Sequence, residues 1–230
     1  MTTPEPRSES AATAVIPPAA AALFGDRLSL ATRYRDLLAG DGVVRGLIGP
    51  RETDRLWERH LLNSAVLTDL LPGDVRVVDV GSGAGLPGIP MAIRRPDLRV
   101  DLVEPMQRRA KFLSEVIDEL GLAGTVRVVR GRAEDPDVAR TAGNSDWVVA
   151  RAVAPLDRLV RWCLPLLSIQ GRLLALKGAR AEDEADRFSA ALREAGARVE
   201  AIEQLGGDVL GERTWVVVVA RAAQAKARGK

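Results

Sequence analysis

The sequence predicts a doubly wound α/β fold, in which a mostly parallel sheet is covered by helices on both faces. After Gly73, short apolar runs rich in Val and Leu alternate with helical segments, which is the pattern of strands buried on both faces. The last two runs have no helix-length segment between them, so they should pair antiparallel. We therefore expect a seven-stranded sheet with an antiparallel C-terminal strand. The expected strands are 75–80, 98–103, 126–130, 147–150, 172–176, 198–204 and 214–220.

The N-terminal third is expected to differ from the rest of the chain. Residues 1–19 are rich in Thr, Pro, Glu, Ser and Ala and include four prolines, which predicts a disordered lead. Apolar residues recur at helical spacing in 20–38 and again in 52–70. Residues 20–72 are therefore interpreted as an N-terminal helical extension.

The sheet domain is expected to span 73–221. Within it, apolar residues line one side of 106–120 and of 182–195, so both segments should be amphipathic helices. The last residues, 222–230, contain basic side chains and no acid and are interpreted as a basic tail.

Composition limits the function classes. The 230 residues contain 33 basic and 31 acidic side chains, a net charge of +2, which is too balanced for a nonspecific DNA coat. One cysteine, Cys163, and one histidine, His60, exclude a disulfide framework and make a Cys/His metal site unexpected. No apolar run reaches the roughly 18 residues of a membrane span, and no secretory signal is found. We expect a cytoplasmic monomer with neither metal nor membrane association.

A glycine-rich loop follows the first expected strand, within 77–90. Gly81, Gly83 and Gly85 allow a tight turn and a close approach of the backbone to a ligand. A phosphate-binding P-loop would end in Gly-Lys-Ser/Thr, whereas Leu86 and a proline stand here. A dinucleotide-binding G-x-G-x-x-G match exists, but its glycines come late and a proline interrupts the start of the helix.

Acidic residues at the strand ends favour a cationic ligand. Asp79 precedes the first glycine by two positions, and Glu104 ends the second strand. S-adenosylmethionine carries a cationic amino group and a sulfonium but no phosphate, so it suits these carboxylates better than a pyrophosphate does. Glu104 could accept both ribose hydroxyl protons, although NAD sites place an acid at the same point. Residues 131–134, after the third strand, could reach an adenine amino group.

The methyl acceptor follows by elimination. Residues 150–155 lack the Asn/Asp-Pro-Pro-aromatic segment of adenine amino methylation, and Cys163 is expected to be a buried apolar residue rather than a nucleophile. No histidine lies downstream of the loop. An acceptor that already has a lone pair, such as guanine N7, needs alignment and charge complementarity rather than a base. Arg151 and Lys177, at the ends of the fourth and fifth strands, are placed to hold guanine O6 or a phosphate.

Six segments together resemble the RsmG (GidB) family of bacterial small-subunit ribosomal RNA methyltransferases, which make N7-methylguanosine in 16S rRNA. They lie in the family's order across most of the ordered chain, and the Gly-Leu-Pro-Gly-Ile-Pro extension of the loop is the most specific of them. The matching segments are 57–64, 79–90, 108–113, 131–134, 151–152 and 175–178.

The resemblance implies a Rossmann-like class I methyltransferase fold, S-adenosylmethionine as cofactor, and 16S rRNA or a 30S ribosomal particle as partner. It implies that His60 and Asn63 face the cofactor cleft and shape its substrate side. Arg151 and Lys177 are the expected catalytic residues, with Lys177 also on the substrate side. The expected cofactor contacts are Gly81, Gly83, Leu86, Glu104, Ala133, Glu134 and Arg151.

Three alternatives stay open from the residues alone. One is a methyltransferase for a small molecule or a protein, which the weak basicity and the 3% aromatic content allow. The second is a nicotinamide oxidoreductase that uses the late glycine match. The third is a ribosome-assembly factor that keeps the cofactor fold without catalysis.

Overall fold

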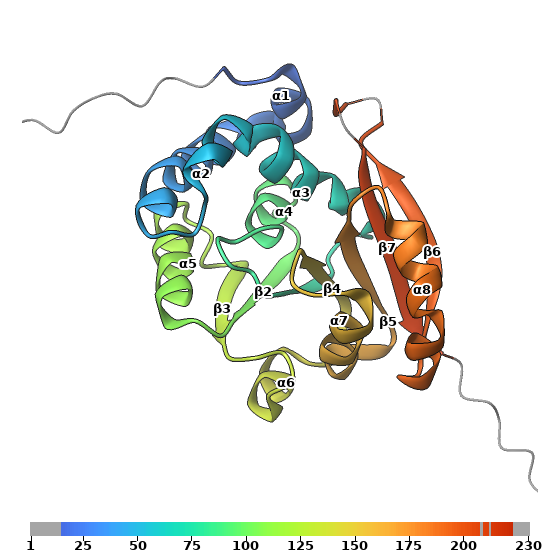
Figure 1. Cartoon of the computed structure of the whole chain (residues 1–230). Coiled ribbons are helices and arrows are strands. Elements are labelled where there is room, and N and C mark those ends of the chain that lie inside the picture. Colours follow the sequence, from blue (N-terminus) through green and yellow to red (C-terminus); the bar gives the residue numbers. More distant parts are fainter. Residues whose placement is uncertain (1–14, 208, 212, 223–230) are drawn as a thin grey trace, which may run out of the picture.

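One seven-stranded sheet runs through the computed structural model, which describes residues 15–207, 209–211 and 213–222 (Figure 1). Its order is β3-β2-β1-β4-β5-β7-β6, and β7 is antiparallel to both of its neighbours while the other neighbouring pairs are parallel. The predicted sheet, including the antiparallel last strand, is confirmed. The strands are β1 (Arg76–Val80), β2 (Arg99–Glu104), β3 (Val126–Arg130), β4 (Ser145–Arg151), β5 (Leu167–Lys177), β6 (Ala197–Leu205) and β7 (Thr214–Arg221).

Helices connect the strands and precede them. The α-helices are α1 (Pro18–Phe24), α2 (Leu28–Leu37), α3 (Asn63–Ala65), α4 (Gly88–Arg94), α5 (Gln107–Glu119), α6 (Pro136–Ala142), α7 (Leu156–Cys163) and α8 (Ala181–Glu194). Short 3₁₀ or π segments occupy Gly25–Arg27, Leu38–Gly42, Pro50–Arg55, Leu56–Leu62, Val66–Leu70 and Leu164–Leu166.

The N-terminal helices are less regular than the sequence predicts. Gly25 ends α1 in the left-handed region, with a φ of 49°. In the second helical stretch the Ser64 hydroxyl donates to the His60 carbonyl (2.5 Å) and the Thr68 hydroxyl donates to the Ala65 carbonyl (2.8 Å). Such back-bonding competes with the helix and bends it, so 3₁₀ and π turns replace one continuous α-helix.

The structure describes only part of the two terminal segments that the sequence predicts. Most of the predicted lead, 1–14, lies outside the described residues, and Pro18 and Ala19 already belong to α1. Of the predicted basic tail, 223–230 also lies outside the described residues.

Two apolar layers cover the two faces of the sheet. The N-terminal helices, α4 and α5 pack on one face, and α6, α7 and α8 pack on the other (Figure 1). Successive strand residues point to opposite faces, so Val77 joins the first layer while Val78 joins the second. Burial on both faces explains why the strands read as continuous apolar runs.

The strand order reverses direction between β1 and β4. From β1 the chain continues to β2 on one side, whereas β4 lies on the other side of β1. In open α/β sheets, ligands bind outside the carboxyl ends of the strands at such a switch point. The glycine loop after β1 and Arg151 at the end of β4 therefore flank the expected crevice.

Gly88 provides a test of how tightly α4 sits on the sheet. A Cβ at Gly88 would lie 2.4 Å from Leu102 Cδ2 and 2.9 Å from Asp79 Oδ2. We expect Gly88→Ala to lower the free energy of unfolding by about 2 kcal/mol through overpacking. Gly124→Ala is the control, because no heavy atom lies within 4 Å of its Cβ, and should change stability by less than about 0.5 kcal/mol. Denaturant unfolding checks this, and equal stabilities of the two variants would contradict it.

Candidate active site

The glycine loop folds back against the ends of two neighbouring strands. The amides of Gly81 and Ser82 donate to the Val103 carbonyl at the end of β2 (2.9 and 3.2 Å). Gly81 has a φ of 71°, and a Cβ there would lie 2.9 Å from Val153 Cγ2, in the segment after β4. The loop therefore bridges β2 and the segment after β4, and its first position accommodates only glycine.

Two buried carboxylates hold this loop by its backbone. Asp79 Oδ2 accepts a hydrogen bond from the Gly88 amide (3.1 Å) at the start of α4. Glu104 accepts from the Gly83 amide through Oε2 and from the Met106 amide through Oε1, both at 2.9 Å. The sequence predicted acids near the loop; the structure places Asp79 beneath it, fully buried, and leaves Glu104 only 1% exposed.

Burial makes the ionised form of the Asp79 side chain energetically unfavourable. Burial raises its pKa to about 7, and the neighbouring Glu104 carboxylate adds to the rise, while the Gly88 amide opposes it. Its second oxygen, Oδ1, is buried and has no hydrogen-bond partner among the described residues. A positive charge placed above the loop would lower this pKa and reduce the cost.

A chain of three side chains connects the N-terminal extension to the end of β4. His60 Nε2 lies 3.0 Å from Glu52 Oε2, and His60 Nδ1 lies 2.7 Å from Arg151 Nη2. Arginine only donates, so Nδ1 accepts and Nε2 carries the proton that Glu52 accepts. Burial, followed by the Arg151 charge, lowers the pKa of His60. The imidazole is therefore neutral, with both nitrogens engaged. Arg151 Nη1 also lies 3.3 Å from the His60 carbonyl and 3.4 Å from Ser64 Oγ.

Lys177 ends β5, and its side chain is fixed by contacts with α8 and with the segment after β4. Its ammonium donates to Glu184 Oε1 of α8 (2.8 Å) and to the Ala154 carbonyl (3.1 Å). Only 11% of its side chain is exposed. The lysine thus fixes the segment after β4 against α8 as well as lining the crevice.

Four of the predicted site residues line one cleft of about 820 Å³, a volume within the range of ligand sites. We call it the central cleft; its predicted members are His60, Asn63, Arg151 and Lys177. Residues that the sequence did not single out also line it: Glu52, Arg59, Arg213, Thr214 and Trp215. Trp215 reaches the cleft because β7 pairs Trp215 with Lys177, a register that local sequence patterns do not encode.

The remaining predicted cofactor residues lie around the loop and beyond β3. Leu86 is half-buried in the loop. Ala133 is buried, and the neighbouring Glu134 is exposed, with its carboxylate 3.8 Å from the Arg132 guanidinium. β3 is separated from β1 by β2, so these two residues lie at the far end of the crevice from the central cleft.

The described part of the chain offers neither an accessible cysteine nucleophile nor a cluster of metal-ligating side chains. Cys163 is buried, and burial raises the pKa of its thiol, as expected for an apolar core residue rather than a nucleophile. Across 15–207, 209–211 and 213–222, no group of three potential metal-ligating side chains occurs. Over the same residues, no helix is long and apolar enough to cross a membrane.

A comparison with models of protein families identifies the family of this chain. The model of the GidB family, rRNA small subunit methyltransferase G, matches residues 27–214. The chain belongs to the GidB family. This confirms the family predicted from the sequence and its assignment to the methyltransferases.

Similar GidB proteins come from several bacteria, and each is named ribosomal RNA small subunit methyltransferase G. The one from Mycobacterium sp. (strain JLS) is 54% identical over 214 residues, covering 93% of this chain and 94% of that protein. The one from Corynebacterium efficiens is 50% identical over 220 residues, covering 96% and 94%. That from Salinispora arenicola is 53% identical over 206 residues, covering 88% and 85%.

Solved structures with the same fold include distant methyltransferases. Aeropyrum pernix fibrillarin, with natively bound S-adenosylmethionine, superposes with a TM-score of 0.51 at 20% identity, covering 70% of this chain and 74% of that chain. The M1A22 tRNA methyltransferase TrmK of B. subtilis gives a TM-score of 0.53 at 14% identity, covering 72% and 66%. These similarities confirm the predicted Rossmann-like methyltransferase fold.

The raised pKa of Asp79 predicts a pH-dependent stability. Its pKa is about 7 in the folded chain and 3.8 in the unfolded chain, so the folded state binds more protons between these values. The stabilisation is complete below pH 3.8 and is lost as the pH rises through 7. Relative to Asp79→Asn, the wild type should lose about 1 kcal/mol per pH unit between pH 5 and 7. Denaturant unfolding at each pH measures this.

The control for that series is Asp118→Asn, at an exposed carboxylate of α5. It should keep the pH dependence of the wild type. An identical slope for the wild type and Asp79→Asn would contradict the buried, protonatable carboxylate.

The single histidine allows the Glu52–His60–Arg151 chain to be tested directly by NMR. The wild-type His60 pKa should lie below the ordinary 6.5. Arg151→Ala should raise the pKa, because it removes a nearby positive charge, and Glu52→Ala should lower it further. A titration of the imidazole Cε1 proton in the untagged protein reports both shifts. Unchanged values in the two variants would show that the three side chains do not interact.

Proposed function

We propose that this chain transfers the methyl group of S-adenosylmethionine to N7 of a guanine in bacterial small-subunit (16S) ribosomal RNA. The observation that carries the proposal is the match to the GidB family over residues 27–214, a family described as rRNA small subunit methyltransferase G. The central cleft supports it, because the Arg151 guanidinium lines it and His60, a lining residue that could act as a base, already has both ring nitrogens engaged by Glu52 and Arg151.

The residues around the loop fit a cationic nucleoside. S-adenosylmethionine supplies a methyl group activated by its positive sulfonium. Asp79 and Glu104 lie under the loop and form no ion pair with any described Lys or Arg, so the cofactor's positive charge would be their counter-ion. The proposed cofactor contacts are Gly81, Gly83, Leu86, Glu104, Ala133, Glu134 and Arg151. Because Glu104 is almost fully buried, a ribose contact requires its side chain to become more exposed.

The substrate side is proposed to align guanine rather than to deprotonate it. Guanine N7 has a lone pair and no hydrogen, so attack on the methyl group requires no proton transfer. His60 is neutral and engaged at both nitrogens, and we assign it a positioning role toward Arg151. N7 must remain free to attack, so Arg151 and Lys177 would contact guanine O6 or a phosphate instead. Transfer is then controlled by alignment and charge.

The same proposal covers the organisation of the chain. Residues 73–221 form the methyltransferase domain, and 20–72 form an extension that supplies His60 and Asn63 to the substrate side. The protein acts as a monomer in the cytoplasm, where its ribosomal substrate is, and it uses no metal.

A methyl-transfer assay tests the proposal. With labelled S-adenosylmethionine and 16S rRNA or 30S particles, the label should appear in N7-methylguanine. Arg151→Ala should lower kcat/KM by about 100-fold or more, as expected for the loss of a charged aligning group. Arg158→Ala, at an exposed arginine of α7, is the control and should stay within about twofold. Label in another base, or only in a small molecule or protein, would refute the proposal.

A further inference from the structure

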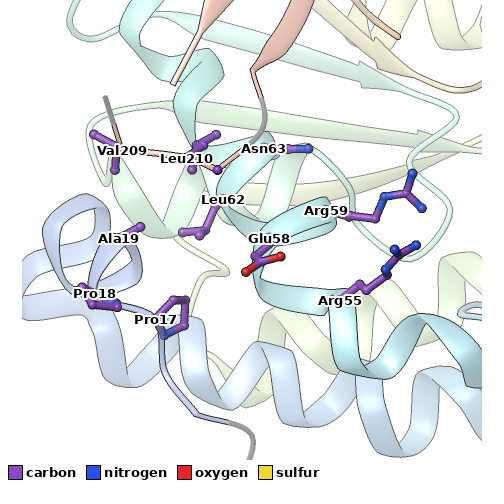
Figure 2. A pocket seen from close by; sticks show the side chains of 11 residues that line it. Pro17, Pro18, Ala19, Arg55, Glu58, Arg59, Leu62, Asn63, Val209 and Leu210 are labelled. Carbon is purple, nitrogen blue, oxygen red and sulfur yellow. The ribbon is translucent and has the colours of Figure 1, made fainter. Parts of the chain in front are cut away.

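Two further cavities continue the central cleft on either side. The first, of about 420 Å³, lies between the start of α1, the turns around Arg55 and Leu62, and residues 209–211 (Figure 2). It shares Arg59 and Asn63 with the central cleft. The second, of about 580 Å³, lies between the segment after β4 and α8 and shares Ala152 and Lys177 with the central cleft. We call the three cavities together the track.

The track is more positive than the chain as a whole. Seven basic and four acidic side chains line it, an excess of three positive charges, whereas the whole chain has an excess of two. The basic residues are Arg55, Arg59, Arg151, Lys177, Arg180, Arg187 and Arg213; the acidic residues are Glu52, Glu58, Asp183 and Glu184. A net excess of positive charge attracts an anionic ligand.

Several of these cations are available to a ligand. Arg55, in the first flanking cavity, and Arg180, in the second, are exposed and make no ion pair with any described residue. Figure 2 shows Arg55 and Arg59 projecting in the same direction from neighbouring turns. Arg187 is also exposed, with its guanidinium 5.3 Å from the centre of the Phe188 ring. Available guanidinium groups therefore lie on both sides of the central cleft.

Flat apolar surfaces accompany these charges. Trp215 lines the central cleft, and Phe188 lines the second flanking cavity. The first flanking cavity has apolar lining from the partly exposed Pro17 and Leu210 but no aromatic side chain (Figure 2). Nucleic-acid grooves for single strands combine cationic side chains along the backbone with surfaces on which bases stack, and the track has both.

The chemistry of guanine N7 indicates which form of RNA the track takes. In an A-form duplex, N7 lies in the deep, narrow major groove, which protein side chains do not enter. An enzyme that acts on a base therefore works on an unpaired strand or takes the base out of the stack. A base placed against Arg151 in the central cleft must therefore be unpaired.

We propose that the track binds an unpaired RNA strand, with the target guanine in the central cleft and a neighbouring nucleotide in each flanking cavity. Arg55 on one side and Arg180 on the other bind the phosphates that flank the target. This inference rests on the proposed function and adds the path of the strand to it.

The test compares two double variants. Arg55→Gln/Arg180→Gln removes from each flanking cavity one arginine that makes no ion pair with any described residue. Arg99→Gln/Arg198→Gln removes two exposed arginines at the amino ends of β2 and β6, the opposite edge of the sheet. The first variant should raise KM for 16S rRNA or 30S particles about tenfold at 0.15 M salt, with kcat and S-adenosylmethionine affinity within about twofold. The slope of log K for RNA binding against log[salt] should become shallower by about 1.4, because each phosphate contact on a single strand contributes about 0.7. The control should match the wild type.

The possible outcomes separate this inference from the proposed function. If the wild type methylates guanine N7 but the two double variants behave alike, the track is wrong and the proposed function stands. If the wild type labels no RNA, the proposed function fails, and fluorescence anisotropy with an unpaired 16S rRNA fragment still decides whether Arg55 and Arg180 bind RNA. Equal affinity for that fragment when it is paired with its complement would overturn binding of an unpaired strand.

Discussion

The arrangement of the crevice depends on two buried carboxylates, Asp79 and Glu104, that hold the glycine loop by its backbone and form no ion pair with any described Lys or Arg. Asp79 anchors the start of α4, and Glu104 accepts the amides of Gly83 and Met106. Backbone amides satisfy the oxygens only in part, because Asp79 Oδ1 is buried without a hydrogen-bond partner among the described residues, and burial raises the pKa of Asp79 to about 7. The same interaction therefore shapes the loop and sets the charge of its ligand, because a sulfonium relieves the burial of negative charge whereas a pyrophosphate adds to it.

The N-terminal extension contributes directly to the site. Glu52 orients His60, and His60 accepts a hydrogen bond from Arg151, so a residue before the sheet controls the position of a side chain at the end of β4. The irregular turns serve this geometry: His60 also presents its carbonyl to Ser64 and to Arg151. The Asn63 amide also donates to this carbonyl, so one backbone oxygen joins the helical turn, the Ser64 hydroxyl and Arg151.

Local sequence patterns predicted the strands and the loop, because a strand buried on both faces and a glycine turn leave signals within a few residues. They did not predict Glu52, whose role depends on a contact with His60 eight positions away in a non-ideal helix. Nor did they predict Trp215, which reaches the central cleft only through the register of β7 on β5. Glu104 was predicted as a site residue because it ends the second strand. Its hydrogen bonds with backbone amides depend on how the loop folds over it and could not be predicted. Tertiary contacts of this kind leave no local pattern.

The distribution of charge across the crevice also fits the direction of the proposed reaction. Carboxylates lie beneath the loop, and guanidinium groups lie along the track. Transfer of a methyl group from a sulfonium to guanine N7 leaves a neutral thioether and a cationic base. One positive charge thus moves from the acidic side to the basic side. The methylated base then faces Arg151 and Arg213 as a like charge, which weakens its binding, while the thioether no longer neutralises the carboxylates. The transfer of charge therefore weakens the electrostatic attraction between each product and the side of the crevice that it occupies.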